Sequence, residues 1–285
     1  MTGPAVVRSR ELVSSREQTG DPGLFGPGSA AWRIDREALI LGGGTCALLM
    51  QLAHPAVAAG VAQHSDFTAD PFGRLVRTLR TSYTVVFGTS PEADAAIRRV
   101  NAIHEQVHGH IPETGERYRA RDPQLLLWVH ATLIDTALRM YDRFVRPLSP
   151  NEAQGYHAEA RQIAVGMGVP EDAVPLTLRE LRSEMDRLMT DGVVRVSPTA
   201  RRLSRSVLYP TGFPPRFVWD AVHLASIWVM PAPIRRGYGI RWSAARERGV
   251  RRVARASRRL VSLLPGVLRE MPQARNAKRR LGLRG

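Results

Sequence analysis

The chain has 285 residues, of which 44% are hydrophobic and 6% aromatic, and its formal net charge is +15 at neutral pH. This hydrophobic content excludes a mostly disordered protein, and the abundance of Ala, Leu, Val and Arg favours helices over sheets. The single cysteine, Cys46, cannot form an internal disulfide, which argues against a disulfide-rich secreted fold. Its apolar neighbours indicate a buried thiol.

Residues 1–30 are rich in Gly, Pro and Ser and lack hydrophobic periodicity, so we expect a flexible N-terminal arm. The arm lacks the apolar stretch of a signal peptide, and no later segment has the roughly 20 apolar residues that span a bilayer. These features predict a cytoplasmic protein, with one helical domain over residues 31–240 and a basic segment over residues 241–285.

Helix signals recur along the rest of the chain. The first expected helix, residues 36–51, contains three consecutive glycines, which indicate close packing, a kink or a break. A proline after a capping residue marks later helix starts at Ser90 and Ser149, and a loop is expected over residues 110–122. Further helices are expected over residues 72–87, 90–108, 124–144, 152–167, 175–189, 201–208, 215–229 and 243–264. The pattern predicts an all-α fold of about eight to ten helices in one large domain.

A histidine pair with zinc-ligand spacing lies in the motif HEQVH, residues 104–108. On a continuous helix this spacing places two imidazoles on one face, with Glu105 positioned to activate a metal-bound water. Gly109 interrupts the helix directly afterwards, and the extended form of the zinc motif is absent. A zinc-dependent hydrolase that uses His104, Glu105 and His108 is therefore one hypothesis, and histidines at a helix end are the structural alternative.

Arg74 and Thr78 lie four residues apart and share one face of an expected helix, with Arg77 and Arg80 beside them. A cation and a hydroxyl one turn apart suit an anionic group such as a carboxylate or a propionate. A solvated basic stripe is the alternative interpretation of this pattern.

Two further histidines, His54 and His64, flank a segment of small apolar residues, PAVAAGVAQ. Small side chains allow another helix or a flat ligand to approach closely. A histidine among apolar neighbours is most often a hydrogen-bonded core residue, and this interpretation extends to His130.

Five motifs follow one another along the chain: LMQLAHPAVAAGVAQHSDF, DPFGRLVRT, RRVNAIHEQVHG, GERYRARDPQLLLWVHATL and YDRFVRPLSP. Over residues 33–245 this series resembles the oxygenase family that includes latex-clearing protein (rubber oxygenase) and the MpaB-type oxygenases. The resemblance implies an all-helical domain with a globin-like core that binds heme b.

The same resemblance implies roles for individual residues. His104 matches the family's axial iron ligand, with His108 as the fallback. Arg74 and Thr78 match the ends of an Arg-x-x-Lys-Thr element beside the heme, and Arg77 stands at its Lys position. A guanidinium stays protonated and is a poor iron ligand, so a distal lysine-type ligand is not expected at this position.

The candidate catalytic residues are Arg77 and His64, the latter as a distal acid or base. The catalytic Glu of rubber cleavage has no clear counterpart before Arg74, which argues against polyisoprene as substrate. We therefore predict a heme b-dependent oxygenase or oxidoreductase that acts on a small or lipophilic organic molecule. A non-catalytic helical protein that binds a hydrophobic ligand or a membrane is the further alternative.

The C-terminal region repeats arginines between apolar residues over 243–264, which predicts a basic amphipathic helix. Such a helix contacts anionic membrane, or packs its apolar face on the domain. Nucleic-acid binding is less favoured, because no recognised motif accompanies the charge. We expect a frayed tail after residue 264.

Overall fold

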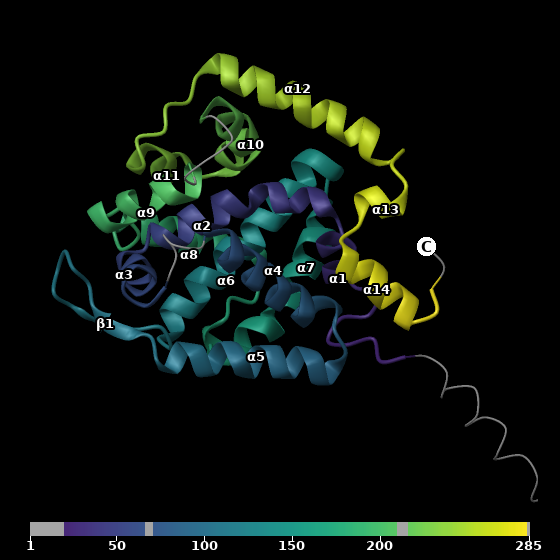
Figure 1. Cartoon of the computed structure of the whole chain (residues 1–285), viewed down its shortest axis with the longest axis horizontal. Coiled ribbons are helices and arrows are strands. Elements are labelled where there is room, and N and C mark those ends of the chain that lie inside the picture. The colour runs from purple at the N-terminus through teal and green to yellow at the C-terminus, as the bar shows by residue number, and fades with distance from the viewer. Residues whose placement is uncertain (1–19, 66–70, 210–215, 284–285) are drawn as a thin grey trace, which may run out of the picture.

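The computed structural model describes residues 20–65, 71–209 and 216–283, without the side chains of residues 71–76 and 216–218. Within these ranges lie 14 α-helices and one two-stranded sheet. The prediction of an all-α protein is confirmed, although the helices outnumber the eight to ten expected. In Figure 1, α5 and α12 border opposite edges of the helical assembly, and α6 lies between them.

The first half of the chain contains α1 (Ala30–Asp35), the 3-10 helix η1 (Ala38–Gly43), α2 (Gly44–Leu52), α3 (Pro55–His64), α4 (Pro71–Phe87), α5 (Ser90–Glu105) and α6 (Pro123–Met140). A π-helical turn, η2 (Tyr141–Val145), extends α6. The second half contains α7 (Pro150–Gly166), the 3-10 turn η3 (Glu171–Ala173), α8 (Leu178–Thr190), α9 (Pro198–Leu208), α10 (Arg216–Val229), α11 (Ala232–Gly237), α12 (Ala244–Val261), α13 (Gly266–Arg269) and α14 (Pro272–Arg280).

Helix α6 is the centre of the core because its neighbours α2, α7 and α8 cover it from several sides. The Asp122 carboxylate accepts a hydrogen bond from the Gln124 amide and caps the helix, and Pro123 occupies its first turn. Trp128 is 1% exposed and its indole nitrogen donates to the Met50 carbonyl at 3.1 Å. The run of large apolar residues that opens α6 is therefore buried on nearly every side.

The three consecutive glycines, residues 42–44, lie where one helix ends and the next begins, and where the chain packs closely on α6. Residues 38–43 form η1, and α2 begins at Gly44. A Cβ atom on Gly43 would lie 2.6 Å from side-chain carbons of Thr136 and Met140, so only glycine lets η1 approach α6 this closely. In the same region Cys46 is 1% exposed, and burial raises the pKa of its thiol to about 12. The prediction of a buried thiol is confirmed.

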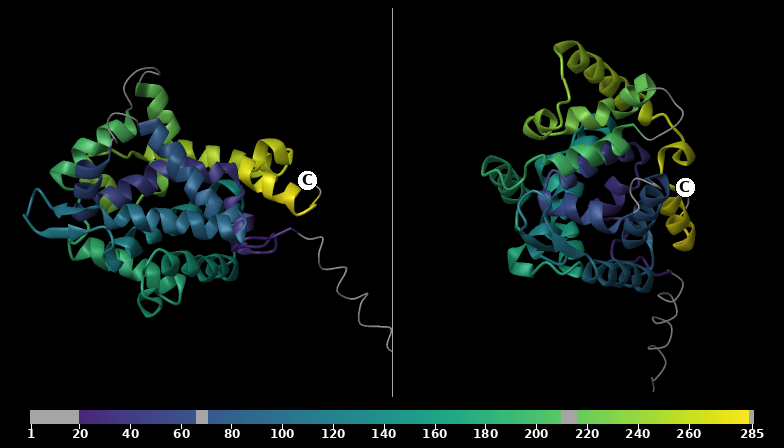
Figure 2. Two further views of the ribbon diagram at one scale, coloured as in Figure 1. Left: turned by 60° about the horizontal axis from the view of Figure 1, so that its bottom comes forward. Right: turned by 60° about the vertical axis from the view of Figure 1, so that its left-hand side comes forward.

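The loop expected over residues 110–122 instead contains most of a β-hairpin. Strands β1 (His108–His110) and β2 (Arg117–Arg119) pair antiparallel and protrude from one end of the molecule (Figure 2). Gly115 takes a φ of 75° in the connecting turn, a conformation that glycine adopts without strain. The expected loop therefore includes strand residues that the sequence pattern did not predict.

The frayed C-terminal tail is also a wrong expectation. Helices α13 and α14 lie at the end of the molecule opposite the hairpin (Figure 2), and α14 packs on α4. Ala274 and Ala277 are fully buried, and the Arg280 guanidinium donates to the Phe87 carbonyl at 2.9 Å. Small side chains on α14 allow this close packing.

The basic helix α12 packs its apolar stripe on the domain, against η2 and α10. Val250, Ala254 and Val261 in this stripe are 1–3% exposed. Of the two interpretations of this helix, packing on the domain is the one that the structure confirms. Among the described residues no single helix meets the length and hydrophobicity needed to cross a bilayer; residues 38–52 and 55–64 do so only jointly, as a pair bent by 102°.

His130 on α6 is buried as predicted, but its Nε2 atom has no hydrogen-bond partner among the described residues. Burial lowers the pKa of this imidazole from 6.5 to about 4, and the nearby His157 adds to the effect. Unfolded chains therefore take up a proton at His130 before folded ones do, so stability is lost as the pH falls from about 6.5 towards 4.

We expect the free energy of unfolding to fall by about 3 kcal/mol over this pH range through His130 alone. His130→Phe fills a similar volume and gives up no hydrogen bond made by Nε2. Because phenylalanine has no imidazole to protonate, the free energy of unfolding of this variant should depend less on pH. Urea denaturation of both proteins at pH 7 and pH 4.5 measures the difference. If the free energy of unfolding falls equally in the two proteins between pH 7 and pH 4.5, His130 is not the source of the pH dependence.

Candidate functional site

His104 lies in the last turn of α5 and is half-buried. Its Nδ1 atom is enclosed and has no hydrogen-bond partner among the described residues. Burial lowers the pKa of the imidazole below its usual value, and the positive charge of Arg121 lowers it further. A neutral imidazole with an unpartnered nitrogen is a suitable ligand for a transition metal such as heme iron.

Arg121 is the neighbour of His104 that the sequence interpretation missed. Its guanidinium donates to the Asn101 side chain at 2.9 Å and to the Met167 carbonyl at 2.7 Å, and it pairs with Glu105 at 3.0 Å. These contacts hold a fixed positive charge beside the end of α5. Arg121 lies within the motif GERYRARDP, and this motif was the sequence signal that could have identified it as a site residue.

Helices α4 and α5 pack against each other and are joined by only Gly88 and Thr89, so they run in opposite directions. At a rise of about 1.5 Å per residue, both Arg74 and His104 lie roughly 20 Å along their helices from this connection. The backbone of the first turns of α4 is thus level with His104. The side chain of Arg74 lies outside the described residues; Arg77 and Thr78 have exposed side chains.

The zinc arrangement is not present in the described part of the chain. Helix α5 ends at Glu105, and His108 begins strand β1 with an exposed side chain. The two imidazoles are therefore not on one helix face, and Glu105 is bound to Arg121. Within the described residues no cluster of three or more His, Cys, Asp or Glu side chains could hold a metal ion.

The small residues of α3 pack against protein side chains. Ala56 and Ala59 belong to a cluster with Ile111, Tyr118 and Leu125, which come from the hairpin region and α6. On another side of α3, Ala58 packs against Ala200 and Leu203 of α9. The small side chains thus allow the close approach of a helix and a hairpin, and the alternative of a flat ligand along this face is wrong for the described residues.

The two histidines that flank α3 have different surroundings. His54 caps the helix by accepting from the Ala56 amide at 3.3 Å, and burial lowers its pKa to about 4. His64 is exposed, so the expectation of a core residue is wrong here. Its Nε2 atom lies 2.8 Å from the His108 carbonyl oxygen, which joins the end of α3 to the hairpin.

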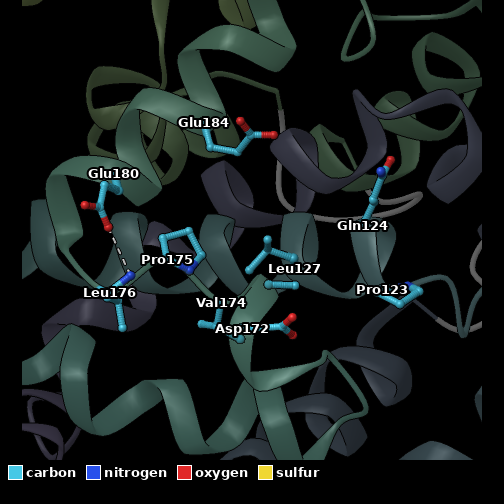
Figure 3. Close-up of a pocket in the computed structure, with 10 residues that line it drawn as sticks. Pro123, Gln124, Leu127, Asp172, Val174, Pro175, Leu176, Glu180 and Glu184 are labelled. Atoms are coloured by element: carbon cyan, nitrogen blue, oxygen red, sulfur yellow. Dashed lines mark hydrogen bonds between the residues drawn. The ribbon is translucent and has the colours of Figure 1, made fainter.

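A cleft with a volume of about 510 Å³ opens between α6 and α8 (Figure 3). Gln124 and Leu127 of α6 lie along one wall, and Glu180 and Glu184 belong to α8. Leu176 donates its amide to the Glu180 carboxylate at 3.1 Å. None of the lining residues belongs to the predicted site, and no sequence signal had marked this cleft.

Two mycobacterial proteins are similar to part of the chain: the uncharacterised protein Mb2261 of Mycobacterium bovis and the uncharacterised protein Rv2237 of Mycobacterium tuberculosis. Each is 29% identical over 132 residues, which cover 45% of this chain and 51% of the relative. The chain thus spans about half the length of the curated relatives it matches. No solved structure matches the chain, and the globin-like core stays a prediction.

The family model described as ER-bound oxygenase mpaB/B'/rubber oxygenase, catalytic domain, matches residues 32–259. This range begins within α1, ends within the last turn of α12, and includes both the α4–α5 pair and His104. The chain therefore belongs to this family, whose model covers most of its length.

Proposed function

We propose that this protein is a heme b-dependent oxygenase that acts on a small or lipophilic organic substrate, with His104 as the axial iron ligand. The family match supports an oxygenase. The observation that carries the choice of ligand is the enclosed, unpartnered Nδ1 atom of an imidazole whose pKa is lowered. These properties fit an iron ligand, because the metal binds the neutral ring.

Each nearby residue has a separate part in the proposal. Bound heme would supply the oxygen chemistry, while the protein sets access and polarity. Arg74 and Thr78 on α4 would hold the propionates, since guanidinium and hydroxyl groups are good partners for carboxylates. Arg121 acts as a positioning residue, because its fixed charge adds to the effect of burial in lowering the pKa of His104.

Two residues are proposed for the reaction itself. Arg77 and His64 both have exposed side chains, so either can meet a substrate that approaches from solvent. The Nε2 atom of His64 is held at the His108 carbonyl, which leaves its Nδ1 atom to carry a proton. The guanidinium of Arg77 would bind an anionic or polar group.

The absorption spectrum of the purified protein tests the proposal. After expression with a heme precursor, we expect a Soret band and stoichiometric iron. A protein that purifies without heme, and that also fails to bind added hemin, contradicts the proposal.

We also propose that the protein contacts anionic membrane peripherally through its C-terminal region. The net charge of +15 supports attraction to an acidic surface, and the outer face of α12 is rich in exposed arginine. A lipophilic substrate would be concentrated at the same surface.

A further inference from the structure

Five apolar side chains stand exposed where α12 ends and α13 begins. Their exposed fractions are 59% for Leu260, 78% for Leu263, 41% for Leu264, 66% for Val267 and 69% for Leu268. Single exposed apolar residues are ordinary on protein surfaces, but five within one short turn form a patch. We call residues 260–268 the apolar turn.

A row of arginines on α12 leads to the apolar turn. Arg248, Arg252, Arg255 and Arg259 recur at spacings of four, three and four residues, so they share one helix face. All four are exposed, and in the described part of the chain no carboxylate forms a salt bridge with any of them. This arginine row lies opposite the buried stripe of Val250, Ala254 and Val261.

Both features lie at the outside of the molecule. Helix α12 runs along one edge of the molecule towards α13 in Figure 1, so the helix that carries the arginine row leads directly to the apolar turn. The base of the turn is fixed to the domain, because Arg269 pairs with Glu37 at 2.7 Å and the Met271 amide donates to the Arg36 carbonyl at 2.7 Å. The turn is therefore presented as a rigid projection.

We propose that the apolar turn inserts into the headgroup region of an anionic bilayer while the arginine row binds the lipid phosphates and carboxylates. Apolar side chains next to arginines that form no salt bridge suit the surface of an anionic bilayer. The apolar side chains enter the boundary of the acyl chains, and the guanidinium groups stay in water near the headgroups. The buried stripe of α12 cannot face lipid, so the lipid contact belongs to the outer face and the turn. This inference rests on the proposed membrane contact and locates it.

Vesicle sedimentation with matched variants tests the surface. Wild-type protein should bind phosphatidylcholine vesicles that contain phosphatidylserine, bind pure phosphatidylcholine weakly, and dissociate at high salt. Leu263→Ser/Leu268→Ser and Arg252→Glu/Arg259→Glu should each weaken binding by about tenfold. Two controls alter equally exposed positions elsewhere: Leu176→Ser, where the leucine is 66% exposed, and Arg98→Glu/Arg99→Glu on α5. Both controls should bind like wild type.

A fluorescent label measures insertion directly. Because Cys46 is 1% exposed, a thiol-reactive nitrobenzoxadiazole dye labels an introduced cysteine selectively. At Leu263→Cys its emission should brighten and shift to the blue with anionic vesicles; at Leu176→Cys it should not change.

Three results would overturn the proposal. Wild-type protein that does not bind anionic vesicles at low salt would remove the membrane contact itself. Equal binding by all variants would place the contact on another surface. A concentration-dependent dimer that the apolar-turn variants dissociate, without vesicle binding, would identify a second copy of the chain as the occupant. None of these measurements depends on heme, so the oxygenase proposal is tested separately.

Discussion

Replacing Arg269 by alanine is expected to lower the free energy of unfolding by about 3 kcal/mol. Its guanidinium pairs at 2.7 Å with Glu37, whose side chain is completely buried. The remaining nearby cation, Arg36, lies 3.6 Å from the other carboxylate oxygen, which has no hydrogen-bond partner among the described residues. The variant thus leaves a buried carboxylate with one distant partner, which is a costly arrangement.

Guanidinium denaturation of the purified variant measures this loss. Arg187→Ala is the matched control: Arg187 also pairs with carboxylates, at 2.6 and 2.9 Å, but it is largely exposed and should affect stability far less. Adding Glu37→Gln to Arg269→Ala should recover part of the loss, because the buried charge is then gone. Equal effects of the Arg269 and Arg187 variants would show that the buried pair is unimportant.

Replacing His104 by alanine is expected to remove nearly all bound heme from the purified protein. The variant deletes the proposed iron–imidazole bond. It breaks no hydrogen bond at Nδ1, since that atom has no partner among the described residues. The fold should therefore survive, and the loss of the Soret band should occur without a change in far-UV circular dichroism.

His108→Ala is the matched control for this experiment. His108 is exposed at the start of β1, outside α5, so its removal should leave heme binding close to that of wild type. If His108→Ala loses heme and His104→Ala retains it, the fallback assignment of the sequence analysis is right and the preferred one is wrong.

Local signals explain why the helix starts could be predicted. At Ser149 the sequence places a capping residue before proline, and in the structure Ser149 and Glu152 form reciprocal bonds at 3.0 and 3.2 Å. The cap of α5 is Thr89, one residue earlier than predicted, because Ser90 already has helical geometry. Such caps involve residues three apart, so a single sequence is sufficient to find them.

Features that depend on distant contacts could not be predicted in the same way. The strands of the hairpin are three residues long and lack β-branched residues, so their pattern is too short to recognise. The tail is helical because α14, whose Ala274 and Ala277 are buried, packs on α4, about 200 residues away in sequence. From the sequence, the apolar face of α12 is equally compatible with burial against the domain and with lipid contact. Its packing on η2 shows that this face is buried.

The candidate site shows the same division. The motif around His104 identifies the residue through its resemblance to the family. Its lowered pKa depends on burial and on Arg121, which is held in place by the carbonyl of Met167. That contact joins segments 46 residues apart, and no local pattern predicts it.

Chemical rescue tests the central claim, that the His104 imidazole binds heme iron, most directly. His104→Gly removes the side chain and leaves room for free imidazole in its place. We predict that this variant lacks a Soret band when purified, and that added imidazole with hemin restores the wild-type absorption spectrum in a saturable manner. A His104→Gly protein that binds heme with the wild-type spectrum without imidazole would contradict the claim.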